Sequence, residues 1–71
     1  MIKEGSKVVL RDVSQFAGRF SNPEAGAIGI VESVIGDGWF HVEWLSGTFQ
    51  GKPIKKSFVN SYEEKDLKVI P

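Results

Sequence analysis

The feature that most constrains this chain is a pair of apolar runs, residues 27–35 and 39–45, which flank Gly36-Asp37-Gly38. The second run alternates between apolar and polar residues, and its apolar members are Phe40, Val42 and Trp44. Alternation with a period of two is typical of a strand that buries one face. An Asp-Gly turn between two such runs is a strong hairpin signal. The sequence therefore predicts a β-hairpin over residues 27–45, with Trp44 in the core.

The first strand of this hairpin is expected to be irregular. Its apolar residues occupy both parities, which a regular half-buried strand does not require. A residue buried on both sides, or a β-bulge near Glu32-Ser33, would explain this pattern, and we favour the bulge. Gly29, inside the strand, indicates a sharp bend or a close approach of another backbone.

Three further short strands are expected, over residues 7–12, 54–59 and 66–70. Asn60-Ser61-Tyr62 is expected to break the second of these as a single turn of tight helix. No segment shows a sustained 3.6-residue apolar period. The predicted fold class is all-β: one domain, residues 1–71, folded as a five-stranded SH3-like barrel with one short helical turn before the last strand. An OB-type barrel is the main alternative, but it needs a helix that the sequence does not indicate.

Composition limits the function classes. Lys plus Arg equals Asp plus Glu, nine each, so the chain lacks the overall positive field of proteins that bind nucleic acid mainly through phosphates. There is no cysteine, and therefore no disulfide or thiolate metal site. No apolar stretch approaches the ~20 residues of a membrane-spanning helix, and no signal peptide is evident. We expect a cytoplasmic protein without membrane insertion.

The chemistry-bearing residues do not form a catalytic pattern. His41 is the only histidine, and one His beside Glu43 does not specify a metal site. The acidic cluster Glu63, Glu64 and Asp66 is interpreted as a solvated turn. The alternative for Asp66 is a hydrogen bond to backbone at the strand entrance. No nucleophile–base pair is apparent. We therefore expect no enzyme, no cofactor and no metal.

A long loop, residues 13–26, follows the first strand and contains Phe16 and Phe20. Two glycines and an Asn-Pro step argue against a continuous helix or strand. Long loops in small domains are often functional or are pinned by their own side chains. The two phenylalanines are either anchors to the barrel or part of a binding surface. A short helical turn from Ser14 to Ala17, capped by Ser14, is a further expectation.

A basic segment, Lys52 to Lys56, carries three lysines between Phe49 and Phe58. Arg11 and Arg19 could extend it from the first loop. Basic residues interleaved with aromatic ones are typical of single-strand or RNA binding. Lysines on an edge strand also discourage aggregation, and they could contact an acidic protein partner. All three interpretations remain open.

The C-terminal half resembles the Mib/Herc domain of certain ubiquitin ligases. The residues that carry this similarity are Val42-Glu43-Trp44, Gly47, Asn60-Ser61-Tyr62 and Asp66-Leu67-Lys68-Val69, with Gly29-Ile30-Val31 and residues 7–11 upstream. The resemblance implies an SH3-like fold that binds peptide segments of protein partners. The chain departs from the family at Glu63, where the family has Arg, and in its first loop. Framework positions are also similar to those of a family of small SH3-like photosystem I proteins and of KOW and Tudor modules.

These observations lead to one functional prediction and one alternative. The prediction is a small non-catalytic adaptor that binds a protein or peptide partner through aromatic and basic loop residues. The expected partner-binding residues are Phe16, Arg19, Phe20, Trp39, Phe49, Lys52 and Tyr62. The alternative is a nucleic-acid-binding accessory protein, with a patch formed by Arg11, Arg19, Lys52, Lys55 and Lys56.

Overall fold

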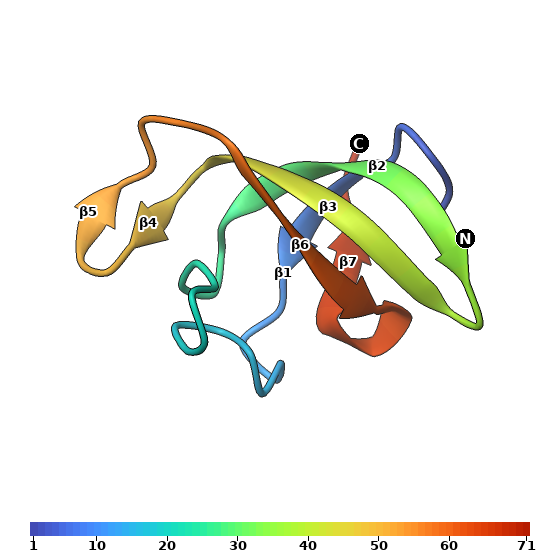
Figure 1. The fold of residues 1–71 in the computed structure, drawn as a ribbon, viewed down its shortest axis with the longest axis horizontal. Coiled ribbons are helices and arrows are strands. Elements are labelled where there is room, and N and C mark those ends of the chain that lie inside the picture. The colour runs from blue at the N-terminus through green and yellow to red at the C-terminus, as the bar shows by residue number, and fades with distance from the viewer.

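The computed structural model describes all 71 residues and contains seven strands and one 3₁₀ turn (Figure 1). The elements are β1 (Lys7–Leu10), β2 (Ile28–Gly36), β3 (Trp39–Ser46), β4 (Thr48–Phe49), β5 (Lys52–Pro53), β6 (Phe58–Glu63), the 3₁₀ turn η1 (Glu64–Asp66) and β7 (Leu67–Val69). The all-β fold class is as expected. There is no helix with the length and apolar character needed to cross a membrane.

Five of the strands form one antiparallel sheet in the order β6-β3-β2-β1-β7. The two edge strands, β6 and β7, are consecutive in the chain and are separated only by the three residues of η1. Since so short a connection has to join opposite edges, the sheet curls strongly, as Figure 1 shows. This arrangement is compatible with the predicted SH3-like barrel.

The predicted hairpin is confirmed as β2 and β3. Asp37 and Gly38 form its two-residue turn, both with positive φ, 52° and 79°. Positive φ at both positions is the type I′ geometry that suits the twist of two adjacent strands. The register between β2 and β3 shifts between Val31 and Ser33, so the bulge lies where it was predicted.

The core lies on the concave side of the sheet. Its buried apolar residues are Ile2, Val8, Leu10, Ala27, Val31, Phe40, Val42, Trp44, Tyr62 and Leu67. At Gly29, β2 lies very close to β3: a Cβ there would lie 2.5 Å from the Glu43 carbonyl oxygen and 2.9 Å from Cε3 of Trp44. The expected close approach at Gly29 is therefore confirmed. Val69 shares the side of Val8 by register but remains exposed at the end of edge strand β7.

The predicted boundaries around the fourth strand are wrong. The strand spans Phe58–Glu63 instead of residues 54–59, and the helical turn occupies Glu64–Asp66 instead of residues 60–62. Asn60 and Tyr62 lie opposite Val42 and Phe40 of β3, so the polar Asn60-Ser61 pair continues the strand. Sheet pairing with β3 outweighs the turn-forming tendency of this short polar segment.

The remaining two strands form a small second sheet that the sequence pattern did not predict. β4 and β5 pair as a hairpin whose turn is Gln50-Gly51, with φ of 52° and 81°. This hairpin projects from the end of β3 and lies away from the curled sheet (Figure 1). The segment from Ser14 to Ala17 forms a hydrogen-bonded turn, in which the Ala17 N–H donates to the Ser14 carbonyl over 3.3 Å, and it does not extend into a helix. Ser14 caps this turn as expected, because its Oγ accepts a hydrogen bond of 3.2 Å from the Phe16 N–H.

Candidate functional site

The largest hollow on the surface is a groove of about 760 Å³ beside the β4–β5 hairpin. One wall is Ser21 of the first loop, which we define as residues 11–27 between β1 and β2. The hairpin, the connection to β6 and the start of β6 form the rest of the lining. The groove is thus formed by one continuous stretch, residues 49–60, together with Ser21 from a distant loop, and we treat it as the candidate functional site.

The apolar lining of the groove is built on two phenylalanine rings. The ring centroids of Phe49 and Phe58 lie 5.1 Å apart with an interplanar angle of 52°. Both side chains are half-buried, and Phe58 also packs against the core together with Ile54. The Ile54 N–H donates a 2.9 Å hydrogen bond to the Gly47 carbonyl, which fixes the connection after β5. Because aromatic rings in a half-open site offer large apolar area at little cost in side-chain freedom, they can act as binding anchors.

The charged lining consists of three lysines. Lys52, Lys55 and Lys56 are exposed, and no carboxylate is among the residues that line the groove. None of the three forms an ion pair, since the one ion pair of the protein joins Lys65 to Glu63 at 3.7 Å. In a chain with no net charge, this is a local concentration of positive charge.

The first loop holds the hairpin in place through Glu24. Its backbone N–H donates to the Thr48 carbonyl over 2.8 Å, and its Oε2 accepts a hydrogen bond of 3.1 Å from the Gly51 N–H. A third link runs from Nδ2 of Asn60 to the carbonyl of Ser21, 3.0 Å. The first loop is therefore hydrogen-bonded to both ends of the stretch that lines the groove, which favours a site that is formed before a ligand arrives.

The tip of the first loop has a strained backbone. Phe20 and Ser21 both have positive φ, 54° and 63°, and the Asn22 N–H donates back to the Arg19 carbonyl over 2.9 Å. This is a type I′ turn without glycine. Nδ2 of Asn22 stabilises it by donating to the carbonyls of Arg19 and Phe20, at 2.8 and 3.1 Å. Backbone strain of this kind is concentrated at functional sites.

The turn presents Phe20 to solvent, with 76% of the residue exposed. Phe16, by contrast, is half-buried and packs edge-on against Tyr62, with centroids 6.2 Å apart. Phe16 therefore anchors the loop, as one interpretation expected. Phe20 packs edge-on against Phe16, with centroids 6.5 Å apart, and is otherwise exposed. Arg19 is exposed on the same loop.

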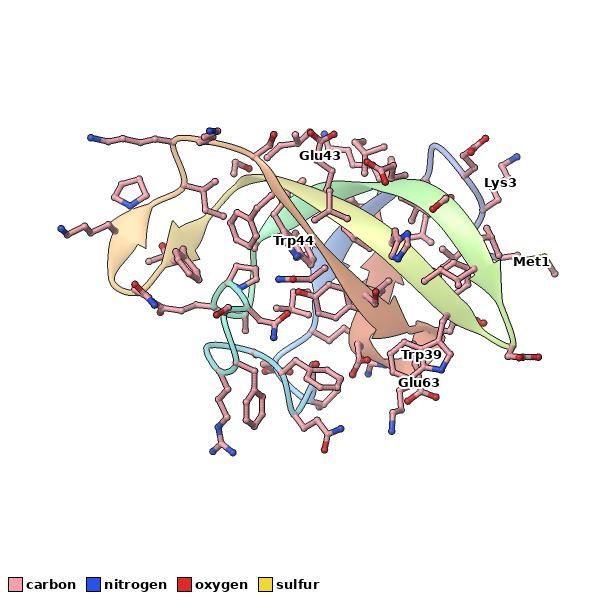
Figure 2. The ribbon with its side chains drawn as sticks, in the orientation of Figure 1. Met1, Lys3, Trp39, Glu43, Trp44 and Glu63 are labelled. Carbon is pink, nitrogen blue, oxygen red and sulfur yellow. The ribbon has the colours of Figure 1, made fainter.

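Of the seven predicted partner-binding residues, only Phe49 and Lys52 line this groove. Tyr62 is fully buried, so its side chain belongs to the core and cannot lie at the margin of an exposed surface. Trp39 is half-buried at the other end of β3, opposite Glu63 on β6 (Figure 2). The groove therefore brings Phe49 and Lys52 together with Ser21 of the first loop. The other predicted residues lie outside its lining: Phe16, Arg19, Phe20, Trp39 and Tyr62.

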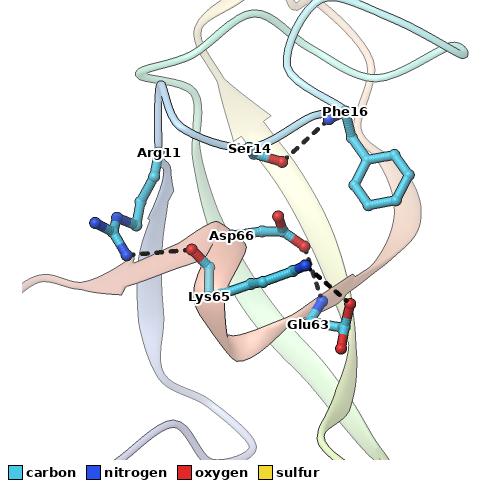
Figure 3. A network of polar contacts seen from close by, with 6 residues as sticks. All are labelled: Arg11, Ser14, Phe16, Glu63, Lys65 and Asp66. Carbon is cyan, nitrogen blue, oxygen red and sulfur yellow. Dashed lines mark hydrogen bonds and ion pairs between the residues drawn. The ribbon is translucent and has the colours of Figure 1, made fainter.

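The predicted nucleic-acid patch is also divided. Lys52, Lys55 and Lys56 surround the groove, but Arg11 lines a separate small hollow with Lys65 and Asp66. There its Nη1 donates to the Lys65 carbonyl over 3.2 Å (Figure 3). In the same region the Glu63 N–H donates to Oδ2 of Asp66 over 3.1 Å (Figure 3). Asp66 is buried, so the alternative of a backbone hydrogen bond holds for it and the solvated turn does not.

One polar pair was not apparent from the sequence. Oγ of Ser33 and Nδ1 of His41 lie 3.1 Å apart on neighbouring strands, because the bulge in β2 places these residues opposite each other. Neither residue lines any of the three hollows, and no carboxylate hydrogen-bonds the histidine. We interpret the pair as a cross-strand contact. No three side chains of His, Asp or Glu come together in a way that could hold a metal ion.

Sequence reasoning also missed Ser21 and Asn60 as parts of the groove. Their contact joins residues 39 positions apart, and neither side chain has a local pattern that indicates it. Comparison of the chain with protein-family models, with curated proteins and with solved structures finds no match.

Proposed function

We propose that this protein is a non-catalytic binding module that recognises a segment of a protein or peptide partner in the groove beside the β4–β5 hairpin. One observation carries the proposal: the half-buried Phe49–Phe58 pair lies among unpaired lysines on a backbone that the first loop fixes. Aromatic anchors in preformed sites supply a large part of binding energy in protein interfaces.

The size of the groove supports recognition of a short segment. A volume of about 760 Å³ lies in the range of sites that enclose a small ligand or a few side chains, roughly 300–1,000 Å³. The exposed Phe20, next to the groove residue Ser21, can add a second apolar contact outside it. The resemblance to peptide-binding SH3-like domains implies the same class of partner.

The test is selection from a displayed library of random peptides, followed by titration of the isotope-labelled protein with the selected peptides in NMR experiments. We expect enriched peptides and chemical-shift changes centred on Ser21, Phe49 and Phe58. Phe49→Ser should weaken binding, and Leu45→Ser, at an exposed apolar residue that does not line the groove, should not. Far-ultraviolet circular dichroism checks that both variants fold. A library without enriched peptides, or shifts centred on Trp39, would overturn the proposal.

The same titration distinguishes the nucleic-acid alternative. Single-stranded oligonucleotides are added in place of peptides at several salt concentrations. Binding led by phosphates weakens steeply as salt rises, whereas binding led by aromatic anchors weakens much less. Oligonucleotide binding at the three lysines that is tighter than any peptide binding would replace the proposal with the alternative.

A further inference from the structure

The distribution of charge around the groove indicates what its occupant carries. We infer that the groove selects an acidic peptide segment, in which an apolar side chain is flanked by Asp or Glu. The apolar side chain would contact the Phe49–Phe58 pair, and the carboxylates would lie toward Lys52, Lys55 and Lys56. This inference rests on the proposed function and specifies the chemistry of the partner.

The first argument is charge complementarity. The protein has nine basic and nine acidic residues, yet the groove lining contains three lysines and no carboxylate. The one carboxylate tied to this hairpin, Glu24, uses its Oε2 to accept from the Gly51 N–H. None of the three ammonium groups forms an ion pair within the protein, and a segment with carboxylates complements them.

The second argument is that edge protection does not explain all three lysines. Lys52 lies on β5, in a two-stranded sheet where it can shield an edge. Lys55 and Lys56 lie in the connection between β5 and β6, outside any strand. Their position beside the aromatic pair is therefore better explained by a ligand than by protection of a strand.

The third argument favours a peptide over nucleic acid. Phe49 and Phe58 are tilted against each other and half-buried, so they do not present two open ring faces on which bases could stack. The positive charge of the groove lining is limited to three lysine side chains, because Arg11 lines another hollow and Arg19 lines none of the three. An apolar lining with a short basic rim suits a side chain flanked by carboxylates better than it suits a phosphate backbone.

The experiment extends the peptide selection with a charge-reversal pair. Lys55→Glu/Lys56→Glu reverses the rim of the groove. Lys3→Glu/Lys68→Glu is the matched control, because it changes the net charge equally at exposed lysines that do not line the groove. We expect selected peptides to be enriched in Asp and Glu around one apolar residue. The groove variant should bind such a peptide about tenfold more weakly at fixed salt, and the control should bind it within about twofold.

A charge-swapped peptide adds a readout that loss of folding cannot mimic. When the acidic residues of a selected peptide are replaced by lysine, the groove variant should bind it more tightly than the unmodified protein does. Enriched peptides without acidic residues, or equal effects of the two charge-reversed variants, would overturn this inference and leave the proposed function standing. A failure to select any peptide would overturn both. Preferential binding of single-stranded oligonucleotides would assign the lysines to phosphate instead.

Discussion

The indole Nε1 of Trp44 donates a hydrogen bond of 2.8 Å to the hydroxyl of Tyr62, and this hydroxyl donates in turn to Oδ1 of Asn22. The two rings meet edge-on with centroids 5.3 Å apart, and both residues are fully buried. One hydroxyl thus satisfies a buried donor on β3 and a buried acceptor on the first loop. Tyr62 is the link between the core and the loop that forms one wall of the groove.

The first prediction concerns this link. Tyr62→Phe keeps the ring but leaves Nε1 of Trp44 and Oδ1 of Asn22 buried without a partner. Since each unsatisfied buried group costs about 1–3 kcal/mol, we expect the free energy of unfolding to fall by roughly 2–3 kcal/mol. Urea denaturation measures this change. A double-mutant cycle with Asn22→Ala should show non-additive effects. A loss within about 0.5 kcal/mol, as for ordinary surface changes, would contradict the proposed role of the hydroxyl.

The second prediction concerns alkaline pH. Burial raises the pKa of Tyr62 above its ordinary value of 10.0, because the phenolate would lose its hydration inside the protein. The folded state therefore holds this proton more tightly than the unfolded state does. The resulting stability is fully present below the unfolded pKa and is lost as pH rises through the folded pKa.

We therefore expect the free energy of unfolding to decline above about pH 10, and Tyr62→Phe to lack this part of the decline. Tyr62 is the only tyrosine, so the ultraviolet absorbance of phenolate reports its titration alone. If that titration in the folded protein matched the one in urea, the buried environment assigned to the hydroxyl would be wrong.

How much the sequence predicts depends on whether the signal is local. The β2–β3 hairpin, its bulge and the burial of Trp44 follow from a period of two, an Asp-Gly turn and Gly29, all within residues 27–45. The bounds of β6 were predicted wrongly because the polar residue Asn60 lies on the inward side of the strand. That polar residue is accommodated by its bond to the Ser21 carbonyl, a contact that no local pattern encodes.

The groove likewise combines residues that the sequence indicates locally with an arrangement that it does not indicate. The lysines and phenylalanines that line it were visible as a basic and aromatic segment, but their arrangement was not. It depends on the β4–β5 hairpin, whose turn places Gln50 at positive φ, a conformation that glutamine does not signal. It also depends on Glu24, which joins the first loop to this turn from 27 residues away. Such long-range polar contacts position the site residues, and the spacing of residues along the sequence does not reveal them.

The third prediction concerns Gly29. Gly29→Ala would place a Cβ within 3 Å of both the Glu43 carbonyl oxygen and the Trp44 ring, so β2 and β3 would have to separate. We expect the free energy of unfolding to fall by about 2–3 kcal/mol, as for overpacked cores. Glu32→Ala, at an exposed position of the same strand, should change it by less than about 0.5 kcal/mol. Thermal denaturation compares the two variants. Similar melting temperatures would show that the close approach at Gly29 is not a constraint.

The fourth prediction concerns the strained tip of the first loop. Ser21 adopts a φ of 63° and its side chain makes no hydrogen bond, so replacement by glycine removes the steric cost of the left-handed backbone and loses no contact. Since that cost is about 1–2 kcal/mol for a residue with a Cβ and glycine loses more freedom on folding, we expect Ser21→Gly to stabilise the protein by about 0.5–1 kcal/mol.

Ser57→Gly is the matched control. Ser57 is exposed and does not have a positive φ, so glycine there adds only freedom to the unfolded chain and should destabilise by roughly 0.5–1 kcal/mol. Urea denaturation of both variants should therefore give shifts of opposite sign. If both substitutions destabilise, the turn at Phe20-Ser21 is not strained. The opposite signs would show that the first loop holds Ser21 in this conformation against its intrinsic preference, which is the property expected of a wall that has to be in place before a ligand binds.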